Sequence, residues 1–182
     1  GLLTEPNKAE QLAAELSDWM DSNNLIDHVH GAEDADYRWR RTPNIPIAHE
    51  SELRAIKSFT ANEFTDIEFW GLFAALPIGS KLNINTASPL VLNAYFADTV
   101  GVDGTAYVLE QRKEGAIEDV SALLASGPFS RLDETQINEL KELFSVRTEY
   151  FQVMVEVRTR DHAQRLATRI QRLETGETNV YS

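Results

Sequence analysis

The stretch that decides the fold runs Leu82-Asn83-Ile84-Asn85-Thr86-Ala87-Ser88-Pro89-Leu90-Val91-Leu92. It combines a short strand-like run, a capped turn and the start of an apolar helix. The stretch Val100-Gly101-Val102-Asp103-Gly104 follows, and a second helix is predicted to end near Gln111-Arg112-Lys113. The sequence therefore predicts two helices joined by a glycine-containing hairpin.

Helix, hairpin and helix together resemble the helix-hairpin-helix units that bind DNA phosphates in some proteins and serve only for packing in others. In a phosphate site, backbone N–H groups at a helix N-terminus would face the anion. Asp103 would place a carboxylate there, and no Lys or Arg follows before Arg112. Residues 61–130 hold 9 acidic and only 3 basic groups. We therefore expect Gly101 and Gly104 to allow close helix packing rather than phosphate binding.

Composition narrows the function classes. The 182 residues carry 17 Lys and Arg against 29 Asp and Glu, a net charge of −12, whereas nucleic-acid binders usually present a basic patch. The absence of cysteine excludes disulfides and thiolate metal sites. No apolar run approaches the ~20 residues that span a bilayer. Because the chain opens at Gly1 rather than Met, we expect a processed or engineered fragment.

Helical periodicity is predicted over residues 5–20, followed by a long irregular stretch over 24–47. Helical signals resume at 51–53. A capping box at Thr60–Glu63, with Phe59 and Phe64 placed as a hydrophobic staple, predicts a helix that extends to Phe73. A second capping box at Asp133–Gln136 opens another helix. No nucleophile elbow, phosphate loop or HExxH motif appears, so no catalytic site is predicted.

After Val146 the hydrophobic period changes to two. Apolar and polar residues alternate over 151–158 and again over 166–171, and the link Thr159–His162 suits a turn. We predict a β-hairpin with one buried face, which must add to a larger sheet or pack on helices because an isolated hairpin is marginally stable. The polar residues 174–182 are predicted to be a flexible tail.

Acidic side chains concentrate between residues 18 and 36. Oxygen ligands clustered on an irregular loop suit calcium, and the alternative is a solvated acidic loop in which Asp and Asn cap turns. An EF-hand that began at Asp21 would need Gly at Ile26 and Glu at Ala32, so this type of site is excluded. His28 and His30 lack a third nitrogen ligand and are interpreted as surface residues. The cluster consists of Asp18, Asp21, Asn23, Asp27, Glu33, Asp34 and Asp36.

Three landmarks in order resemble the minor pseudopilin K family of type II secretion. Residues 18–21 (Asp-Trp-Met-Asp) and 31–37 (Gly-Ala-Glu-Asp-Ala-Asp-Tyr) are similar to the family's Trp-Leu-Asp and Gly-Ala-Glu-Asp-x-x-Tyr motifs. Residues 82–87 and 89–92 resemble its Ile-Asn-Val-Asn-Thr-Ala-Pro segment, and 145–151 resemble the entry to its late strands. The resemblance spans roughly residues 12–172.

The resemblance implies an α+β fold, in which a pilin-like antiparallel sheet carries a large inserted α-helical domain with helix-hairpin-helix (SAM-like) units. Residues 1–144 would form the insert, with the acidic loop near 21–36 and part of 37–50 left open as a contribution to the sheet. Residues 145–173 would form the C-terminal hairpin. The family also implies calcium in the α-domain, and with oxygen chemistry this selects Asp21, Asn23, Glu33 and Asp34 as ligands.

The resemblance further implies a non-catalytic protein at the pseudopilus tip that assembles with minor pseudopilins I and J in the periplasm. Membrane anchoring would come only from an N-terminal apolar helix that this chain lacks. The alternative is a nucleic-acid-binding helix-hairpin-helix protein of the DNA-uptake type. The acidic composition favours the first hypothesis, for which no nucleic acid is expected as a partner.

Overall fold

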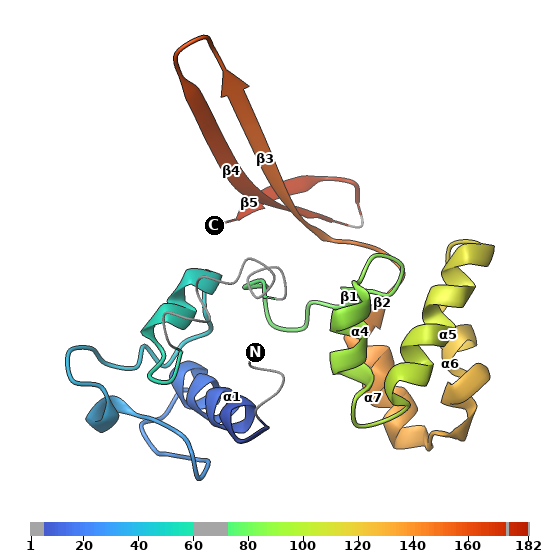
Figure 1. Ribbon diagram of the computed structural model, residues 1–182, viewed down its shortest axis with the longest axis horizontal. Coiled ribbons are helices and arrows are strands. Elements are labelled where there is room, and N and C mark those ends of the chain that lie inside the picture. The colour runs from blue at the N-terminus through green and yellow to red at the C-terminus, as the bar shows by residue number, and fades with distance from the viewer. Residues whose placement is uncertain (1–5, 60–72, 174, 182) are drawn as a thin grey trace. The chain divides into compact units, whose positions relative to one another are not determined.

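The computed structural model describes residues 6–59, 73–173 and 175–181. The chain divides into two compact units, Gly1–Ile78 and Gly79–Ser182. Figure 1 shows helices in both units and strands in the second. Among the helices that the structure describes, none has the length and apolar character to cross a bilayer.

The first unit is built on helix α1 (Pro6–Met20). Two short 3-10 helices follow, η2 (Asp34–Asp36) and η3 (Glu50–Ala55), and irregular chain connects them. One face of α1 packs on the end of η3, which confirms the helix predicted over 5–20 and its apolar face. The buried apolar residues of this unit's core are Leu12, Trp19, Leu53, Ile56 and Phe59.

The predicted helix after Thr60 and the possible contribution of residues 37–50 to the sheet are not confirmed in this unit. The capping box at Thr60–Glu63 and most of the helix it opens lie outside the described residues. Residues 37–50 are described and contain no strand, so they add nothing to a sheet in this structure. The irregular character predicted for 24–47 is confirmed apart from the single turn of η2.

The second unit begins with the stretch quoted first. Strand β1 (Leu82–Asn83) leads through a turn to α4 (Pro89–Phe96), then to α5 (Gly101–Glu114) and α6 (Val120–Leu124). The 3-10 helix η4 (Gly127–Arg131), α7 (Glu134–Leu143) and β2 (Phe144–Ser145) complete this part. Strands β1 and β2 pair in parallel, and they bring the two ends of the helical region together.

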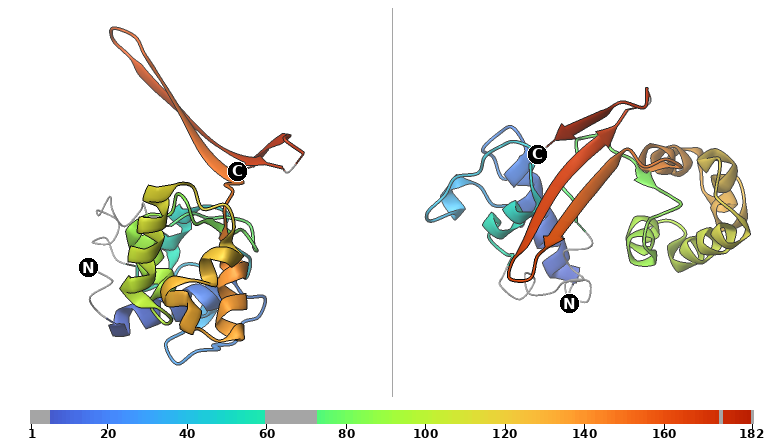
Figure 2. Two further views of the ribbon diagram at one scale, coloured as in Figure 1. Left: turned by 90° about the vertical axis from the view of Figure 1, so that its right-hand side faces the viewer. Right: turned by 90° about the horizontal axis from the view of Figure 1, so that it is seen from above.

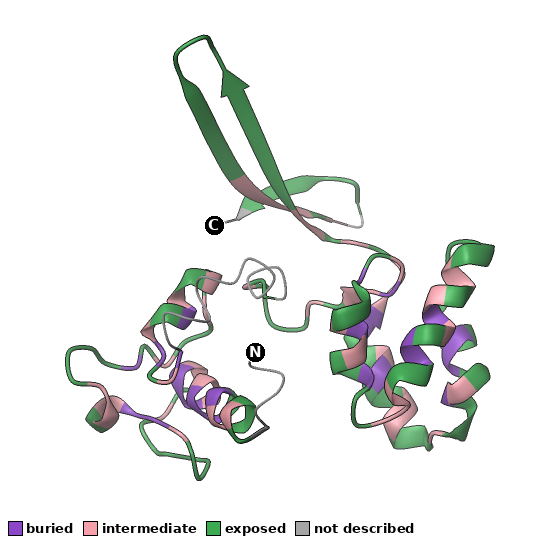
Figure 3. Ribbon diagram, viewed as in Figure 1, coloured by how far each residue is buried: buried purple, intermediate pink, exposed green. Residues whose placement is uncertain are grey.

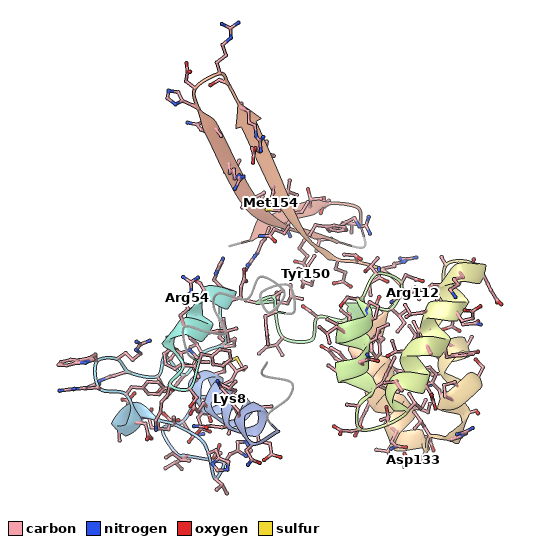
Figure 4. The ribbon with its side chains drawn as sticks, viewed as in Figure 1. Lys8, Arg54, Arg112, Asp133, Tyr150 and Met154 are labelled. Carbon is pink, nitrogen blue, oxygen red and sulfur yellow. The ribbon has the colours of Figure 1, made fainter. Side chains whose placement is uncertain are left out.

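Local capping explains where these helices begin. Ser88 Oγ accepts a hydrogen bond from Val91 N at 3.3 Å, with Pro89 in the first turn of α4. At α7 the predicted capping box is confirmed. Asp133 Oδ1 accepts from Gln136 N at 2.9 Å, and Gln136 Oε1 accepts from Asp133 N at 3.2 Å (Asp133 is labelled in Figure 4).

The glycines of the predicted hairpin have different roles. The turn lies at residues 97–100 and not over the predicted stretch 100–104, and Gly101 opens α5 with a φ of +58°. Asp103 and Gly104 already belong to the helix. A Cβ on Gly104 would lie 3.2 Å from the Phe96 ring and 3.3 Å from the Phe129 ring. Close packing is thus the role of Gly104, as predicted, whereas Gly101 makes the turn.

The C-terminal residues form an antiparallel sheet in the order β3-β4-β5. The hairpin of β3 (Tyr150–Arg158) and β4 (Ala163–Arg172) confirms the prediction, with Arg158 opposite Ala163 across the link 159–162. Figure 2 shows these two strands as a long twisted ribbon. Strand β5 (Thr178–Tyr181) pairs with β4, so the expectation of a flexible tail over 174–182 is corrected for these residues.

The apolar face of the sheet is uncovered. Val155 and its neighbour across the strands, Leu166, are 48% and 65% exposed. Figure 3 shows β3 and β4 exposed along most of their length, in contrast to the buried positions within the helical region. Within the described residues of the second unit, the face predicted to be buried is therefore largely exposed.

Candidate metal centre

Two carboxylates on the buried side of α1 have opposite surroundings. Glu15 is 1% exposed and Asp18 is 0% exposed. Glu15 Oε1 accepts from Ser58 Oγ at 2.6 Å and from Gln11 Nε2 at 2.9 Å, and Oε2 accepts from Ser58 N at 2.7 Å. Hydrogen bonds to both oxygens compensate part of the cost of burying this charge.

Asp18 has no such compensation. Neither of its carboxylate oxygens has a hydrogen-bond partner among the described residues. The loop that includes Ile26 and Gly31 covers it, and a Cβ added to Gly31 would overlap Asp18 Oδ2. A glycine is therefore required where the loop crosses the carboxylate. An unpaired buried carboxylate is costly and needs either protonation or a cation.

Two further carboxylates present one buried oxygen each. Asp21 Oδ1 accepts from Asn23 N at 2.9 Å and Glu33 Oε2 accepts from Thr42 Oγ1 at 2.8 Å. Asp21 Oδ2 and Glu33 Oε1 are buried and find no partner in the described part of the chain. Hard oxygen atoms of this kind are the ligands that calcium prefers.

The other two predicted ligands already have partners. Asn23 Oδ1 accepts from Leu25 N at 2.7 Å, which closes a turn. Asp34 Oδ1 accepts from Thr42 N at 2.9 Å and from Thr42 Oγ1 at 3.0 Å, and Asp34 Oδ2 lies 3.9 Å from Arg41 Nε. The roles of Asn23 and Asp34 as metal ligands stay predictions.

Within the ranges that the structure describes, no three His, Cys, Asp or Glu side chains are grouped closely enough to hold a metal ion by themselves. Calcium also takes backbone carbonyl, amide and water oxygens, so its ligand set is not restricted to such groups. The donor chemistry of Asp18, Asp21 and Glu33 fits calcium. His28 and His30 are exposed, in agreement with their interpretation as surface residues.

Asp18 belongs to the acidic cluster of residues 18–36 but was not among the four predicted ligands. A signal for it was present, because Glu15 and Asp18 lie three residues apart on the same side of the helix as Leu12. Carboxylates on the apolar face of a helix are unusual, since Asp and Glu are almost never fully buried unless they are paired. Such residues deserve consideration as ligands before those of the adjoining loop.

Among the described residues, the region that resembles a helix-hairpin-helix unit presents no site for an anion such as phosphate. The guanidinium of Arg112, labelled in Figure 4, donates through Nε at 2.8 Å and through Nη2 to the carbonyl of Ile84, and through Nη1 at 2.8 Å to that of Ala87. Burial lowers the pKa of Arg112. A hollow beside the end of α5 is lined by Glu114, Glu118 and Asp119, which would repel phosphate. Arg112 therefore stabilises the turn between β1 and α4.

Two family models, both described as type II secretion system (T2SS) protein K, match residues 1–70 and 82–147. The type II secretion system protein K of Pseudomonas aeruginosa is 31% identical over 175 residues, which cover 91% of this chain and 48% of that protein. The protein K of Pectobacterium carotovorum subsp. carotovorum is 26% identical over 165 residues, which cover 86% of this chain and 48% of the relative.

A solved structure gives the same result. The crystal structure of the GspK-GspI-GspJ complex from the enterotoxigenic Escherichia coli type 2 secretion system matches with a TM-score of 0.80 and 25% sequence identity. The match covers 97% of this chain and 62% of that chain. The chain spans about half the length of the curated relatives it matches. Because the two family models together match well over half of its residues, this chain belongs to the protein K family of the type II secretion system.

Proposed function

We propose that this chain is part of a non-catalytic minor pseudopilin that assembles with minor pseudopilins I and J at the tip of the type II secretion pseudopilus. The observation that carries the proposal is the fold match over 97% of the chain to a protein solved within the GspK-GspI-GspJ complex. In that role the protein contributes to export across the outer membrane through assembly rather than chemistry.

In this proposal the sheet β3-β4-β5 is the C-terminal part of a pilin-like domain, and the helices are its SAM-like, helix-hairpin-helix insert. The exposed Val155 and Leu166 support the proposal, because an apolar sheet face that water reaches calls for a further polypeptide surface to cover it. The protein would lie in the periplasm and be anchored in the inner membrane by an apolar helix outside these residues.

The assembly is tested by size-exclusion chromatography of the protein with purified minor pseudopilins I and J. We expect one co-eluting complex, and Val155→Asp should abolish it because a charge would enter the covered face. Met154→Asp is the matched control. Met154, labelled in Figure 4, precedes Val155 on the same strand, and successive strand residues face opposite sides of a sheet. Separate elution of the unmodified proteins, or equal loss with both variants, contradicts the proposal.

The nucleic-acid alternative has a direct test. Fluorescence anisotropy with a labelled DNA duplex at low salt should show no binding, because the acidic surface repels phosphate and Arg112 is engaged internally. Salt-sensitive binding in the micromolar range would favour the DNA-uptake type of function over the pseudopilin.

A calcium ion is the second component of the proposed function. Asp21, Asn23, Glu33 and Asp34 are retained as the predicted ligands, and Asp18 is added to them. Because the described carboxylates are not grouped as a metal site by themselves, backbone carbonyl and water oxygens would have to complete the coordination. The partnerless buried oxygens of Asp18, Asp21 and Glu33 support the site, as found among the described residues. Calcium would neutralise buried charge and tie α1 to the loop that follows it.

Thermal unfolding with calcium or with a chelator tests this site. A ligand that binds only the folded state stabilises it by about 2.7 kcal/mol at 100 times its Kd, so calcium should raise Tm by several degrees. Magnesium at the same concentration is the control, since it demands a tighter octahedral geometry. An unchanged Tm in calcium rejects the site but leaves the assembly with pseudopilins I and J standing.

A further inference from the structure

The segment Arg38-Trp39-Arg40-Arg41, here called the arginine–tryptophan arm, is a local basic and aromatic patch on an acidic protein. Trp39 is 84% exposed, and the guanidinium carbon of Arg38 lies 4.9 Å from its ring centroid. A tryptophan is usually largely buried, so this degree of exposure calls for an explanation. The stacked Arg38 keeps a cation at the face of the indole.

The arm is held in place on both sides. Before it, the Tyr37 ring packs edge-on against the Trp19 ring, with centroids 5.4 Å apart. After it, buried Thr42 donates from its backbone N to Asp34 Oδ1 at 2.9 Å and from Oγ1 to Glu33 Oε2 at 2.8 Å. The exposed indole therefore sits between two fixed anchors, which lowers the conformational entropy that binding would cost.

A hydrogen bond from Arg40 also attaches the arm to the rest of the first unit. Arg40 Nη1 donates to the carbonyl of Arg54 at 3.5 Å, which links the arm to η3 (Arg54 is labelled in Figure 4). Arg41 contacts Asp34 only at 3.9 Å, and its side chain is 88% exposed. Both ends of the arm are thus positioned by the unit, while the indole and most of the Arg41 side chain face solvent.

We propose that the arginine–tryptophan arm is a docking surface for an acidic surface of another protein. Trp39 would enter an apolar recess of the partner, and Arg38 and Arg41 would pair with carboxylates around it. Trp and Arg are the residue types most enriched among the few that dominate protein–protein binding energy. This surface goes beyond the proposed assembly, because it lies on the irregular loop of the first unit and not on the sheet.

The charge pattern favours a protein over a uniform polyanion. Acidic Asp34 and Asp36 lie close to the arm in sequence, and Asp34 contacts Arg41. A phosphate-covered membrane or a sulfated polysaccharide would meet these carboxylates as well as the arginines, and membrane recognition usually needs 4–8 basic residues, roughly twice the number in the arm. A protein can place carboxylates opposite the arginines alone.

The test uses the whole chain and a short fluorescein-labelled peptide in which two glutamates flank a cluster of leucine and phenylalanine, so that its carboxylates are local rather than spread along a polyanion. Anisotropy at low salt should show binding that Trp39→Ala and Arg38→Ala each weaken about tenfold or more. Two control variants should change it less than about twofold, because exposed residues away from the arm make no specific contact. These controls are Ile45→Ala, exposed on the same loop, and Arg131→Ala, exposed in the second unit.

Each result supports or overturns the docking surface. Peptide binding that depends on Trp39 and Arg38, and exceeds the binding of heparin and of phosphatidylglycerol vesicles, supports it. Absent binding, equal weakening by the control variants, or tighter binding of heparin or vesicles overturns it. A loss of Tm in the Trp39→Ala variant would also overturn it, because Trp39 would then serve the fold. None of these results bears on the assembly through the sheet.

Discussion

The two regions around Glu15 and Asp18, one turn apart on α1, differ in how a buried carboxylate is stabilised. Around Glu15 the fold supplies three donors, two of them from Ser58. Around Asp18 the described residues supply none, although the side chain is equally buried. The comparison shows that burial alone does not reveal a ligand site. What distinguishes one is burial without donors, which the fold tolerates only if something else carries the positive charge.

The helical region and the sheet of the second unit differ in a similar way, because the apolar side chains of one are covered and those of the other are exposed. Residues of the helical region such as Leu92, Phe96 and Phe129 form a core that is complete within the described chain. The sheet has an equally regular apolar face and leaves it exposed. A complete core needs no partner, whereas an uncovered face points to one.

The largest expected effect in this comparison comes from Glu15→Ala. It leaves Ser58 N without its carboxylate acceptor and should lower the free energy of unfolding by about 3 kcal/mol, since hydrogen bonds to charged groups contribute most. Urea denaturation measures the loss, which should be equal with calcium and with chelator. Glu10→Ala, at an exposed position on the same helix, should change stability by less than about 0.5 kcal/mol. A loss that calcium repairs would place Glu15 in the metal site instead.

The second-largest loss of stability is expected for Gly31→Ala. The new Cβ overlaps Asp18 Oδ2, so we expect a loss of about 2 kcal/mol from overpacking. Combining it with Asp18→Ala should recover part of the loss, because the two groups compete for one space. Gly115→Ala is the control, since its Cβ would meet nothing within 4 Å. Equal losses at Gly31 and Gly115 would show that Asp18 does not fill this space.

The effect of Asp18→Asn on stability should have opposite signs with chelator and with calcium. With chelator, removal of an unpaired buried charge should raise stability by about 1 kcal/mol. With calcium, loss of a ligand charge should lower Tm relative to the unmodified protein. Parallel thermal melts decide it, and destabilisation of the same size in both solutions would mean that Asp18 holds no cation.

The smallest effect concerns Tyr37, whose ring packs on Trp19 next to Asp18. Burial raises the pKa of Tyr37 to about 12, and the charge of Glu15 adds to the increase. Because this pKa lies above the ordinary value near 10, the contribution to stability is full below pH ~10 and is lost as pH rises toward 12. Phenolate absorbance should include a late-titrating component that Tyr37→Phe removes. If Tyr37→Phe instead removes a tyrosine that titrates near pH 10, the burial of Tyr37 against Trp19 is contradicted.

Much of the fold was predictable, because its signals are local. The Asp133 capping box, the helix over 5–20 and the hairpin with its link at 159–162 all rest on residues within a few positions of one another. The parallel pair of β1 and β2 was not predicted, since two-residue strands far apart in sequence carry no periodicity. Strand β5 was missed because its polar surroundings resemble those of a frayed terminus.

The candidate site was predictable in part. Asp21 and Glu33 were in the expected ligand set and each has a buried oxygen that no described residue contacts. Asp18 was outside that set, although it belongs to the quoted motif, because its burial without a donor follows only from the folded structure. The engagement of Asn23 with Leu25, and of Asp34 with Thr42, depends on how the loop folds back on itself.

The sequence by itself determined the family, the helices near residues 6–20, 89–96 and 134–143 and the β-hairpin with its link at 159–162, because capping and hydrophobic periodicity act within a few residues. The tertiary structure alone decided which buried carboxylate is satisfied and which is not. Ser58, which supplies most of the donors of Glu15, lies 43 residues away in the chain. Such a partner follows from packing, which brings distant backbone groups together at hydrogen-bond distance, and the charge left without one marks the proposed calcium site.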